Sequence, residues 1–221
     1  MSKFRVVIFD MDGLMIDSEP VHSKAFERVF EECDKIPNLD TEGMVDYVIG
    51  IRDKDNWQLL KDRYGFVEDV DYLVERRRKI YLELLEKSIQ LREGFRELFD
   101  TLKKNDTRLA IASASPMEQV NIIVDKFGMR DDFDALVSAD DLKESKPNPE
   151  VYLVTAKKLA VSPENCVVME DTQTGVESGR NAGMRVIVVP SQYTKDQDFS
   201  KADLVANSLE DKKIYSFLGI G

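Results

Sequence analysis

The sequence predicts a doubly wound α/β fold: a Rossmann-like parallel sheet core with an inserted α-helical domain. Short β-branched runs recur along the chain, and helical patterns lie between them. Several of these runs are apolar at consecutive positions, as expected when helices cover both faces of a sheet. One long segment, from about residue 18 to residue 88, carries helical patterns without intervening strands. These three observations together favour a sheet core with a helical insertion.

The strand pattern begins near the N-terminus and resumes only after the helical segment. The predicted strands are Arg5 to Phe9, Arg108 to Ala112, Ala135 to Val137, Cys166 to Met169 and Arg185 to Val189. Each run is too short for a helix and is rich in the residue types that strands favour.

Two helices of the core have recognisable starts. Ser115 is a suitable N-cap, Pro116 suits the first helical position, and Glu118 follows three residues after the cap. Thr174 and Glu177 have the same capping-box spacing. Glycines at positions 175, 179 and 183 fall on one face of the second helix, which predicts close backbone approach there.

The insertion is predicted to form a separate helical domain. Its first helix is indicated by apolar residues at helical spacing, namely Val21, Ala25, Phe26, Val29, Phe30 and Cys33. Further helical patterns follow from Trp57 to Leu85, and the chain returns to the core near Leu91 to Gly94. We therefore assign residues 1–17 and 89–221 to the core and residues 18–88 to the insertion, with Asp17 and Ser18 at the hinge.

Composition narrows the class of protein. The 221 residues are 43% hydrophobic, no apolar run is long enough for a membrane span or a signal peptide, and we expect a cytoplasmic protein. A net charge of −11 disfavours nucleic-acid and membrane partners. Cys33 and Cys166 are too few for a disulfide framework and are expected to be packing residues.

Two strands are predicted to end in acidic pairs. Asp10 and Asp12 follow the first strand, and Glu170 and Asp171 follow the strand that begins at Cys166. Ligands of open parallel sheets bind beyond the carboxyl ends of the strands. Either pair alone could cap the next helix, but two pairs at matching strand ends indicate a cation site.

A hydroxyl and an ammonium complete the predicted site. Ser113 ends the second strand and Lys146 precedes a proline-rich loop, although alone either residue is typical of a turn or a solvated surface. With the acids they suit phosphoryl transfer: Asp10 as nucleophile, Asp12 as general acid and then base, and Lys146 screening charge. The Ser113 hydroxyl and nearby backbone N–H groups, including that of Ala114, can hold phosphoryl oxygens.

This ordered set resembles the signature of the haloacid dehalogenase superfamily over nearly the whole chain. The resemblance rests on DxDG at Asp10 to Gly13, on Ser113, on Lys146 and on the Glu170-Asp171 pair. It implies Mg²⁺ held by Asp10, the backbone carbonyl of Asp12 and Asp171, with Glu170 at or near the metal. It also implies that the insertion is a cap domain of the four-helix type. The stretches "FDMDGLMIDSEP", "ASASP", "SKPNPEVYL" and "MEDTQTGV" are similar to those of hexose or hexitol phosphate phosphatases and of β-phosphoglucomutases.

The insertion offers weaker candidates. In the stretch Gly50-Ile51-Arg52, Arg52 comes shortly after a glycine, as an Arg does in related caps. It suits a phosphate or sugar hydroxyls, although pairing with Asp53 or Asp55 is an equal alternative. For the basic run Arg76 to Lys79 we favour a solvated face, with Arg77 the member to test. His22 could line a cleft and Trp57 could stack on a sugar ring, but we expect structural roles for both residues.

The sequence thus predicts a Mg²⁺-dependent phosphatase that hydrolyses a small phosphorylated metabolite, a sugar or polyol phosphate, and that acts as a monomer. The alternative is a β-phosphoglucomutase, which would share every core residue. Pro116 favours hydrolysis, because mutases tend to carry a polar residue there. A catalytically silent binding protein is disfavoured because Asp10, Asp12 and Lys146 are all present.

Overall fold

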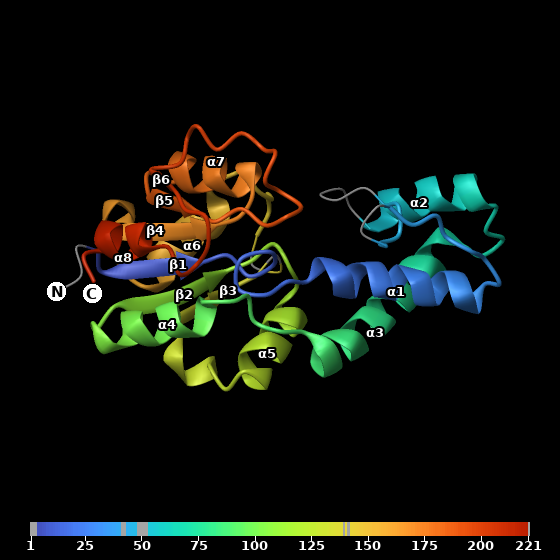
Figure 1. The fold of residues 1–221 in the computed structure, drawn as a ribbon, viewed down its shortest axis with the longest axis horizontal. Helices are drawn as coiled ribbons and strands as arrows, with labels where there is room; N and C mark the ends of the chain where they lie inside the picture. Colours follow the sequence, from blue (N-terminus) through green and yellow to red (C-terminus); the bar gives the residue numbers. More distant parts are fainter. Residues whose placement is uncertain (1–3, 41–42, 48–52, 139, 141, 221) are drawn as a thin grey trace. The chain divides into compact units, whose positions relative to one another are not determined.

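The chain folds into two compact units. The structure is a computed structural model that describes residues 4–40, 43–47, 53–138, 140 and 142–220 (Figure 1). Contacts within the chain group Met1–Asp17 with Gln90–Gly221 as one unit and Ser18–Ile89 as the other. The second unit therefore ends one residue beyond the boundary that we assigned from the sequence.

The first unit is built on a parallel sheet in the order β3-β2-β1-β4-β5-β6. The strands are β1 (Val6–Phe9), β2 (Arg108–Ala112), β3 (Ala135–Val137), β4 (Cys166–Glu170), β5 (Arg185–Val188) and β6 (Leu204–Val205). This arrangement confirms the predicted doubly wound α/β fold. Of the strands that the structure describes, only β6 was not predicted, because a strand of two residues has no periodicity to detect.

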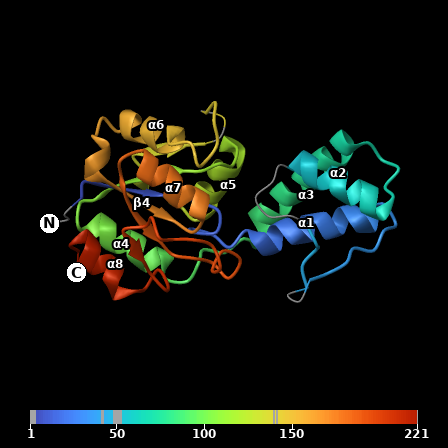
Figure 2. The ribbon, with the colours of Figure 1, turned by 90° about the horizontal axis from the view of Figure 1, so that it is seen from above.

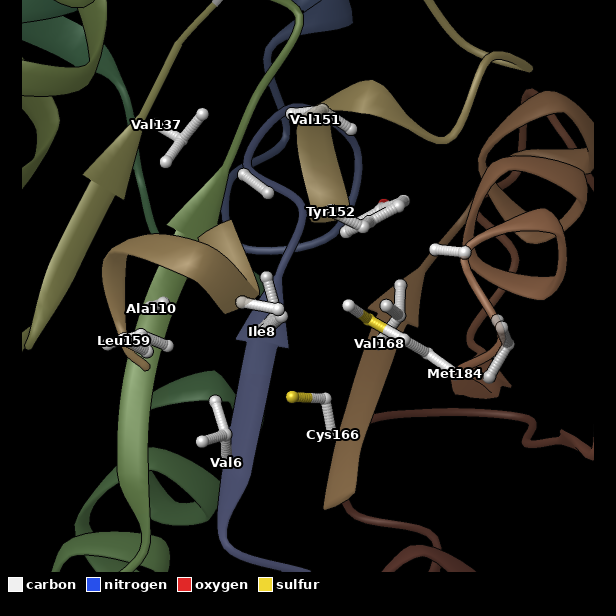
Figure 3. Close-up of a cluster of buried hydrophobic side chains, with 14 of the residues drawn as sticks. Val6, Ile8, Ala110, Val137, Val151, Tyr152, Leu159, Cys166, Val168 and Met184 are labelled. Carbon is white, nitrogen blue, oxygen red and sulfur yellow. The ribbon is translucent and has the colours of Figure 1, made fainter. Parts of the chain in front are cut away.

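Helices cover both faces of the sheet. They are α4 (Phe95–Lys104), α5 (Met117–Lys126), α6 (Glu150–Lys158), α7 (Gln173–Asn181) and α8 (Lys212–Leu218), with short 3₁₀ turns at Arg130–Asp132 and Pro163–Asn165. Figure 2 shows α6 on one side of the sheet, with α4 and α8 on the other. Val6, Ile8 and Val168 pack on one face with Tyr152 of α6 (Figure 3), while Phe9 faces α4, its ring centroid 5.2 Å from that of Phe95. The fully buried strands explain their continuous apolar runs.

The two predicted helix caps were wrong. Helix α5 begins at Met117, with Pro116 at the N-cap, and the Met117 N–H donates to Asp140 Oδ2 at 2.8 Å. Helix α7 is capped by Thr172, whose hydroxyl accepts the Gly175 N–H at 3.1 Å. In both cases a different side chain accepts the N–H groups at the start of the helix. Which side chain does so depends on the conformation of the loops.

The second unit contains three helices in its described residues: α1 (Glu19–Glu32), α2 (Asp53–Tyr64) and α3 (Val70–Ser88). The resemblance implied a helical domain of the four-helix type. Trp57 is fully buried, with Phe26, Phe30 and Phe66 around its ring, which supports the structural role expected for it. Among the helices that the structure describes, none has both the length and the apolar composition needed to cross a bilayer.

A buried cation lies inside this helical unit. Arg77 was favoured as part of a solvated face, but its side chain is only 8% exposed and donates to Asp53 Oδ2 at 2.7 Å. It also donates to Nδ1 of His22, and its guanidinium lies over the rings of Phe26 and Tyr81. The helical period explains the error, because one residue of a four-residue basic run must face inward when its neighbours face water.

His22 is held neutral by these contacts. Its ring stacks on Tyr81 at 4.1 Å, and Nδ1 can accept from Arg77 only when it carries no proton. Burial and the neighbouring charge of Arg77 place the pKa of His22 well below its usual value. A base whose pKa is lowered by folding stabilises the fold above its unfolded pKa, and this stability is lost as the pH falls.

We therefore predict that replacing His22 removes an acid sensitivity of this protein. His22→Gln keeps an acceptor for Arg77 but cannot gain a proton. As the pH falls from about 7 to about 5, the wild type should lose up to about 1.4 kcal/mol of stability per pH unit relative to the variant. Thermal unfolding of both proteins across this range checks the difference, and parallel stability curves would contradict it.

Candidate active site

The acidic residues meet at the switch point of the sheet. Strand β1 lies between β2 and β4, so the chain winds outward in both directions from it. Phe9 is in register with Met169, and the Asp10 N–H donates to the Met169 carbonyl at 2.9 Å, which brings Asp10 beside Glu170. Carboxylate oxygens of Asp10, Glu170 and Asp171 all lie within 4.8 Å of one another, and all three residues are buried. The structure thus brings together three of the four acidic side chains that the sequence predicted at these strand ends.

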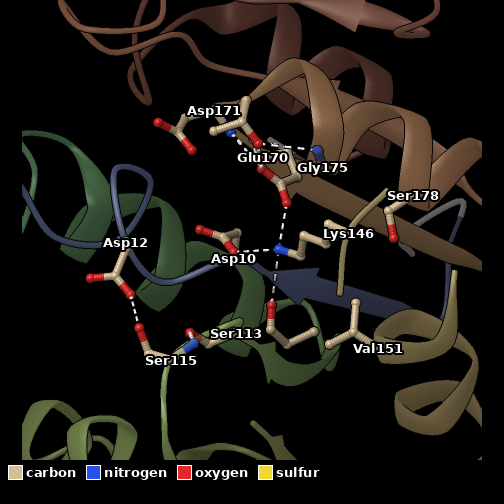
Figure 4. Close-up of polar contacts among 12 residues, drawn as sticks. Asp10, Asp12, Ser113, Ser115, Lys146, Val151, Glu170, Asp171, Gly175 and Ser178 are labelled. Atoms are coloured by element: carbon tan, nitrogen blue, oxygen red, sulfur yellow. Dashed lines mark hydrogen bonds and ion pairs between the residues drawn. The ribbon is translucent and has the colours of Figure 1, made fainter. Parts of the chain in front are cut away.

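Lys146 links the two strand ends (Figure 4). Its Nζ lies 2.5 Å from Asp10 Oδ1 and 2.6 Å from Glu170 Oε1. The Lys146 side chain is 10% exposed, so this ammonium is a buried partner of two carboxylates and not the solvated surface group that a loop lysine usually is. A hydrogen bond from Ser178 to the Asn148 carbonyl, at 2.7 Å, ties the proline-rich loop to α7 and helps to hold Lys146 in place.

Glu170 is surrounded by donors. Tyr152 donates to Oε1 at 2.6 Å, and the Thr172 hydroxyl and the Asp171 N–H each lie 3.1 Å from Oε2. The sequence analysis missed Tyr152. Its distance of six residues from Lys146 becomes informative only when α6 is known to turn the ring back under the lysine, whose Nζ lies 5.2 Å from the ring centroid.

Burial and neighbouring charges shift the pKa values of the ionisable groups in this cluster. Burial raises the pKa of Asp10 to about 8, with Glu170 adding to the rise and Lys146 opposing it. Burial and the charges of Glu170 and Asp10 also raise the pKa of Asp171 well above its usual value. Glu170 differs: although burial favours its protonation, the charge and hydrogen bond of Lys146 and the hydrogen bonds of Tyr152 and Thr172 hold its pKa low. Despite burial, the charges of Asp10 and Glu170 raise the pKa of Lys146, which stays an ammonium.

The residues of this corner fit a divalent cation. Asp171 is 3% exposed, and its Oδ1 has no hydrogen-bond partner in the described part of the chain. A buried carboxylate oxygen without a donor is costly unless a cation binds it. Hard divalent cations take oxygen ligands of this kind. Asp10, Asp171 and Glu170 therefore offer oxygens to such an ion, and the Asp12 carboxylate lies outside this group.

Two glycines leave room for these carboxylates. A Cβ on Gly13 would lie 2.2 Å from Asp171 Oδ2, and one on Gly175 would lie 1.9 Å from Glu170 Oε1. The spacing of the α7 glycines predicted close backbone approach. At Gly175 the close neighbour is the Glu170 carboxylate, whereas at Gly179 it is Val186 in the core.

Asp12 and the Ser113 loop form a second part of the site. Asp12 Oδ2 accepts a hydrogen bond from the Ser115 hydroxyl at 2.6 Å and points away from Asp10 in Figure 4. Ser113 is 1% exposed, and its Oγ accepts the Ser115 N–H at 3.0 Å. Ala114 is exposed and borders a cavity of about 210 Å³, which is also lined by Val151 and residues 142–146. The cavity reaches Ala114 and Lys146, but Asp10, Asp12, Ser113, Glu170 and Asp171 are not among the residues that line it.

Arg92 is a further residue that sequence reasoning missed. Its guanidinium donates to the Gly13 carbonyl and to those of Val189 and Pro190, at 3.1 and 3.2 Å. These bonds fix the loop after β1 against the end of β5. No motif marks this arginine, because its partners are backbone atoms distant in sequence. Arg52, the predicted substrate contact, lies outside the described residues.

The fold and this geometry define a class: doubly wound α/β proteins with an acidic, lysine-bridged site at the switch point of a parallel sheet. A sequence profile described as haloacid dehalogenase-like hydrolase matches residues 7–189. The chain therefore belongs to the haloacid dehalogenase-like hydrolase family. A metal ion is a general feature of this family, in keeping with the acidic cluster.

Individual relatives are similar to this chain over most of their length. Hexitol phosphatase B of Escherichia coli (strain K12) is 36% identical, over 96% of this chain and 96% of its own. A phosphorylated carbohydrates phosphatase of Thermotoga maritima is 31% identical over 82% of each chain. Among solved structures, CbbY from Rhodobacter sphaeroides in complex with phosphate has a TM-score of 0.80 and 26% identity, over 93% of this chain and 95% of that one.

We predict that cation binding stabilises the protein more at high pH than at low pH. Without a cation, the raised pKa of Asp10 stabilises the fold at low pH, and this stability is lost as the pH rises from about 4 to about 8. A bound cation displaces the proton and removes the loss. The rise in Tm on adding Mg²⁺ to chelator-treated protein should therefore be larger at about pH 8 than at about pH 6. Asp171→Asn, which removes a ligand, should show little rise, and equal rises at both pH values in the wild type would contradict the prediction.

We also predict different outcomes for the two glycines of α7. Both Gly175→Ala and Gly179→Ala overpack the protein and should cost about 1–3 kcal/mol of stability. Only Gly175→Ala displaces the Glu170 carboxylate, so only this variant should lose the Mg²⁺-dependent rise in Tm. Gly179→Ala is the matched control, because its new methyl group meets Val186 in the core. A normal Mg²⁺ response in folded Gly175→Ala would show that the space for Glu170 does not matter.

Proposed function

We propose that this protein is a Mg²⁺-dependent phosphatase that hydrolyses a small phosphorylated metabolite, a sugar or polyol phosphate, through an aspartyl-phosphate on Asp10. The observation that carries the proposal is the buried contact of Asp10 with Lys146, 2.5 Å apart, beside the carboxylates of Glu170 and Asp171. A carboxylate that is to attack a phosphate dianion needs nearby positive charge, both to stay ionised and to reduce repulsion. The arrangement supplies this charge.

In the proposed first step, an Asp10 oxygen bonds to phosphorus as the bond to the leaving ester oxygen breaks. Lys146 offsets the charge of the phosphoryl group, and the bond to Glu170 keeps the ammonium in place. Asp10, Asp171, Glu170 and the backbone carbonyl of Asp12 are the proposed holders of Mg²⁺, which when bound would add positive charge beside the phosphoryl oxygens.

Asp12 is the proposed proton carrier of the reaction. It gives a proton to the leaving oxygen in the first step, and it accepts one from the water that releases phosphate from Asp10 in the second. The Ser113 hydroxyl and the Ala114 N–H are proposed to hold phosphoryl oxygens, because both groups can donate hydrogen bonds to them.

The class of substrate is supported by the relatives. The hexitol phosphatase and the phosphorylated carbohydrates phosphatase are named for phosphorylated sugars or polyols, and both are similar to this chain over most of its length. The core residues engage only the phosphoryl group, so recognition of the rest of the substrate is assigned to the helical insertion as a cap domain. Arg52 is the proposed contact.

We predict that the protein with Mg²⁺ releases phosphate rapidly from hexose or hexitol phosphates within a panel of sugar, polyol and nucleotide monophosphates. Phosphate release measures the hydrolysis. A parallel assay follows conversion of β-glucose 1-phosphate to glucose 6-phosphate with a bisphosphate primer. Isomerisation with little phosphate release would overturn the phosphatase in favour of the mutase.

Asp10→Asn is the control for the covalent step. The carboxamide is not nucleophilic, so kcat should fall by about 10³-fold or more. Full activity of this variant would exclude an aspartyl-phosphate on Asp10.

A further inference from the structure

The Ser115 hydroxyl contacts Asp12 across a sequence separation of 103 residues. Ser115 lies in the loop between β2 and α5, and its Oγ is 2.6 Å from Asp12 Oδ2 (Figure 4). This distance is typical of a charge-assisted bond from a hydroxyl to a carboxylate. Asp12 is thus held from the loop that carries Ser113, the proposed phosphoryl ligand.

Ser115 is not occupied with the helix that follows it. Its position before Pro116 predicted an N-cap, yet the N-cap residue of α5 is Pro116, and the Ser115 hydroxyl bonds to Asp12. Asp140 instead accepts the Met117 N–H at 2.8 Å. Asp140, a residue from another loop, therefore caps α5, and the Ser115 hydroxyl bonds to Asp12.

The loop is braced so that Ser115 has a defined position. The Ser115 N–H donates to Ser113 Oγ at 3.0 Å, and the Ser113 N–H continues the sheet by donating to the Val137 carbonyl at 3.0 Å. The Ser115 side chain is therefore positioned relative to the end of β2. A hydroxyl held in this way can restrict the rotamers of the carboxylate that it contacts.

A hydroxyl also suits a group that must gain and lose a proton. The ammonium of Lys146 bonds to Asp10 and Glu170, where a permanent positive charge favours ionised carboxylates. A neutral hydroxyl can donate to Asp12 when it is ionised and can still bond to it when it is protonated. It fixes orientation without holding Asp12 in one charge state.

We propose that Ser115 is a positioning residue that orients the Asp12 carboxylate toward the leaving oxygen of the substrate. This inference rests on the proposed function, in which Asp12 is the general acid. As the Asp10 oxygen bonds to phosphorus, the proton of Asp12 passes to the leaving ester oxygen and the phosphorus–oxygen bond breaks. Water then attacks phosphorus, gives its proton to Asp12 and frees the Asp10 carboxylate.

The test compares leaving groups. An alkyl alcohol is a poor leaving group and needs the proton, whereas p-nitrophenolate leaves without one. Ser115→Ala should lower kcat/KM about 10- to 100-fold for the best alkyl phosphate of the wild type and no more than about twofold for p-nitrophenyl phosphate. The ratio kcat/KM is the right measure because it covers only the steps up to departure of the leaving group.

Three variants separate positioning from structural damage. Ser115→Thr keeps the hydroxyl and should restore most of the alkyl phosphate activity. In an Asp12→Asn background, Ser115→Ala should change the alkyl-to-aryl ratio by no more than about twofold, because the group that it orients is gone. Asp140→Ala removes the cap of α5 and should lower the Tm while leaving this ratio unchanged.

The outcomes distinguish this inference from the function on which it rests. Equal losses for alkyl and aryl phosphates in Ser115→Ala would overturn the positioning role, since they indicate phosphoryl binding or general damage. A full effect of Ser115→Ala in the Asp12→Asn background would overturn it as well. A wild type that hydrolyses no alkyl phosphate would instead refute the proposed function, before any variant is compared.

Discussion

The structure of the site depends on one buried ammonium. Lys146 lies between Asp10 and Glu170 at the switch point of the sheet, within hydrogen-bonding distance of both. Buried carboxylates repel one another and are costly to ionise, and removing one partner of a buried pair costs about 3–5 kcal/mol. Lys146 therefore allows two strand ends to carry acids side by side. Asp171 Oδ1 has no hydrogen-bond partner among the described residues, so this oxygen can bind a divalent cation.

Several residues without chemistry of their own exist to maintain this arrangement. Gly13 and Gly175 leave volume for the carboxylates of Asp171 and Glu170. Tyr152 donates to Glu170 from the core face of α6, so that the polar site and the hydrophobic core share one side chain. Arg92 holds the loop after β1 through backbone carbonyls. These contacts hold the carboxylates and the loop after β1 in place, as preorganised catalysis requires.

The sequence was informative where a physical pattern is local. Short β-branched runs, several of them apolar at consecutive positions, predicted five of the strands, since such runs can be recognised without knowing which strands pair. Local pattern failed where two side chains compete for one partner. Ser115 and Thr174 both satisfy the rules for helix caps, but Asp140 and Thr172 bond to the exposed N–H groups. Arg77 has the composition of a surface residue, and its burial against Asp53 and His22 follows from the packing of three helices.

The sequence by itself determined the fold class and the identity of the acids, hydroxyl and lysine of the site, because strand positions follow from local apolar runs and ligands bind beyond the carboxyl ends of parallel strands. Only the tertiary structure determined which of these side chains contact one another. It joined Asp10, Glu170 and Lys146, left Asp171 Oδ1 without a hydrogen-bond partner in the described part of the chain, and turned Asp12 toward Ser115. Hydrogen bonds and charge pairs act over a few ångströms, and only the folded chain brings residues more than a hundred positions apart to that distance.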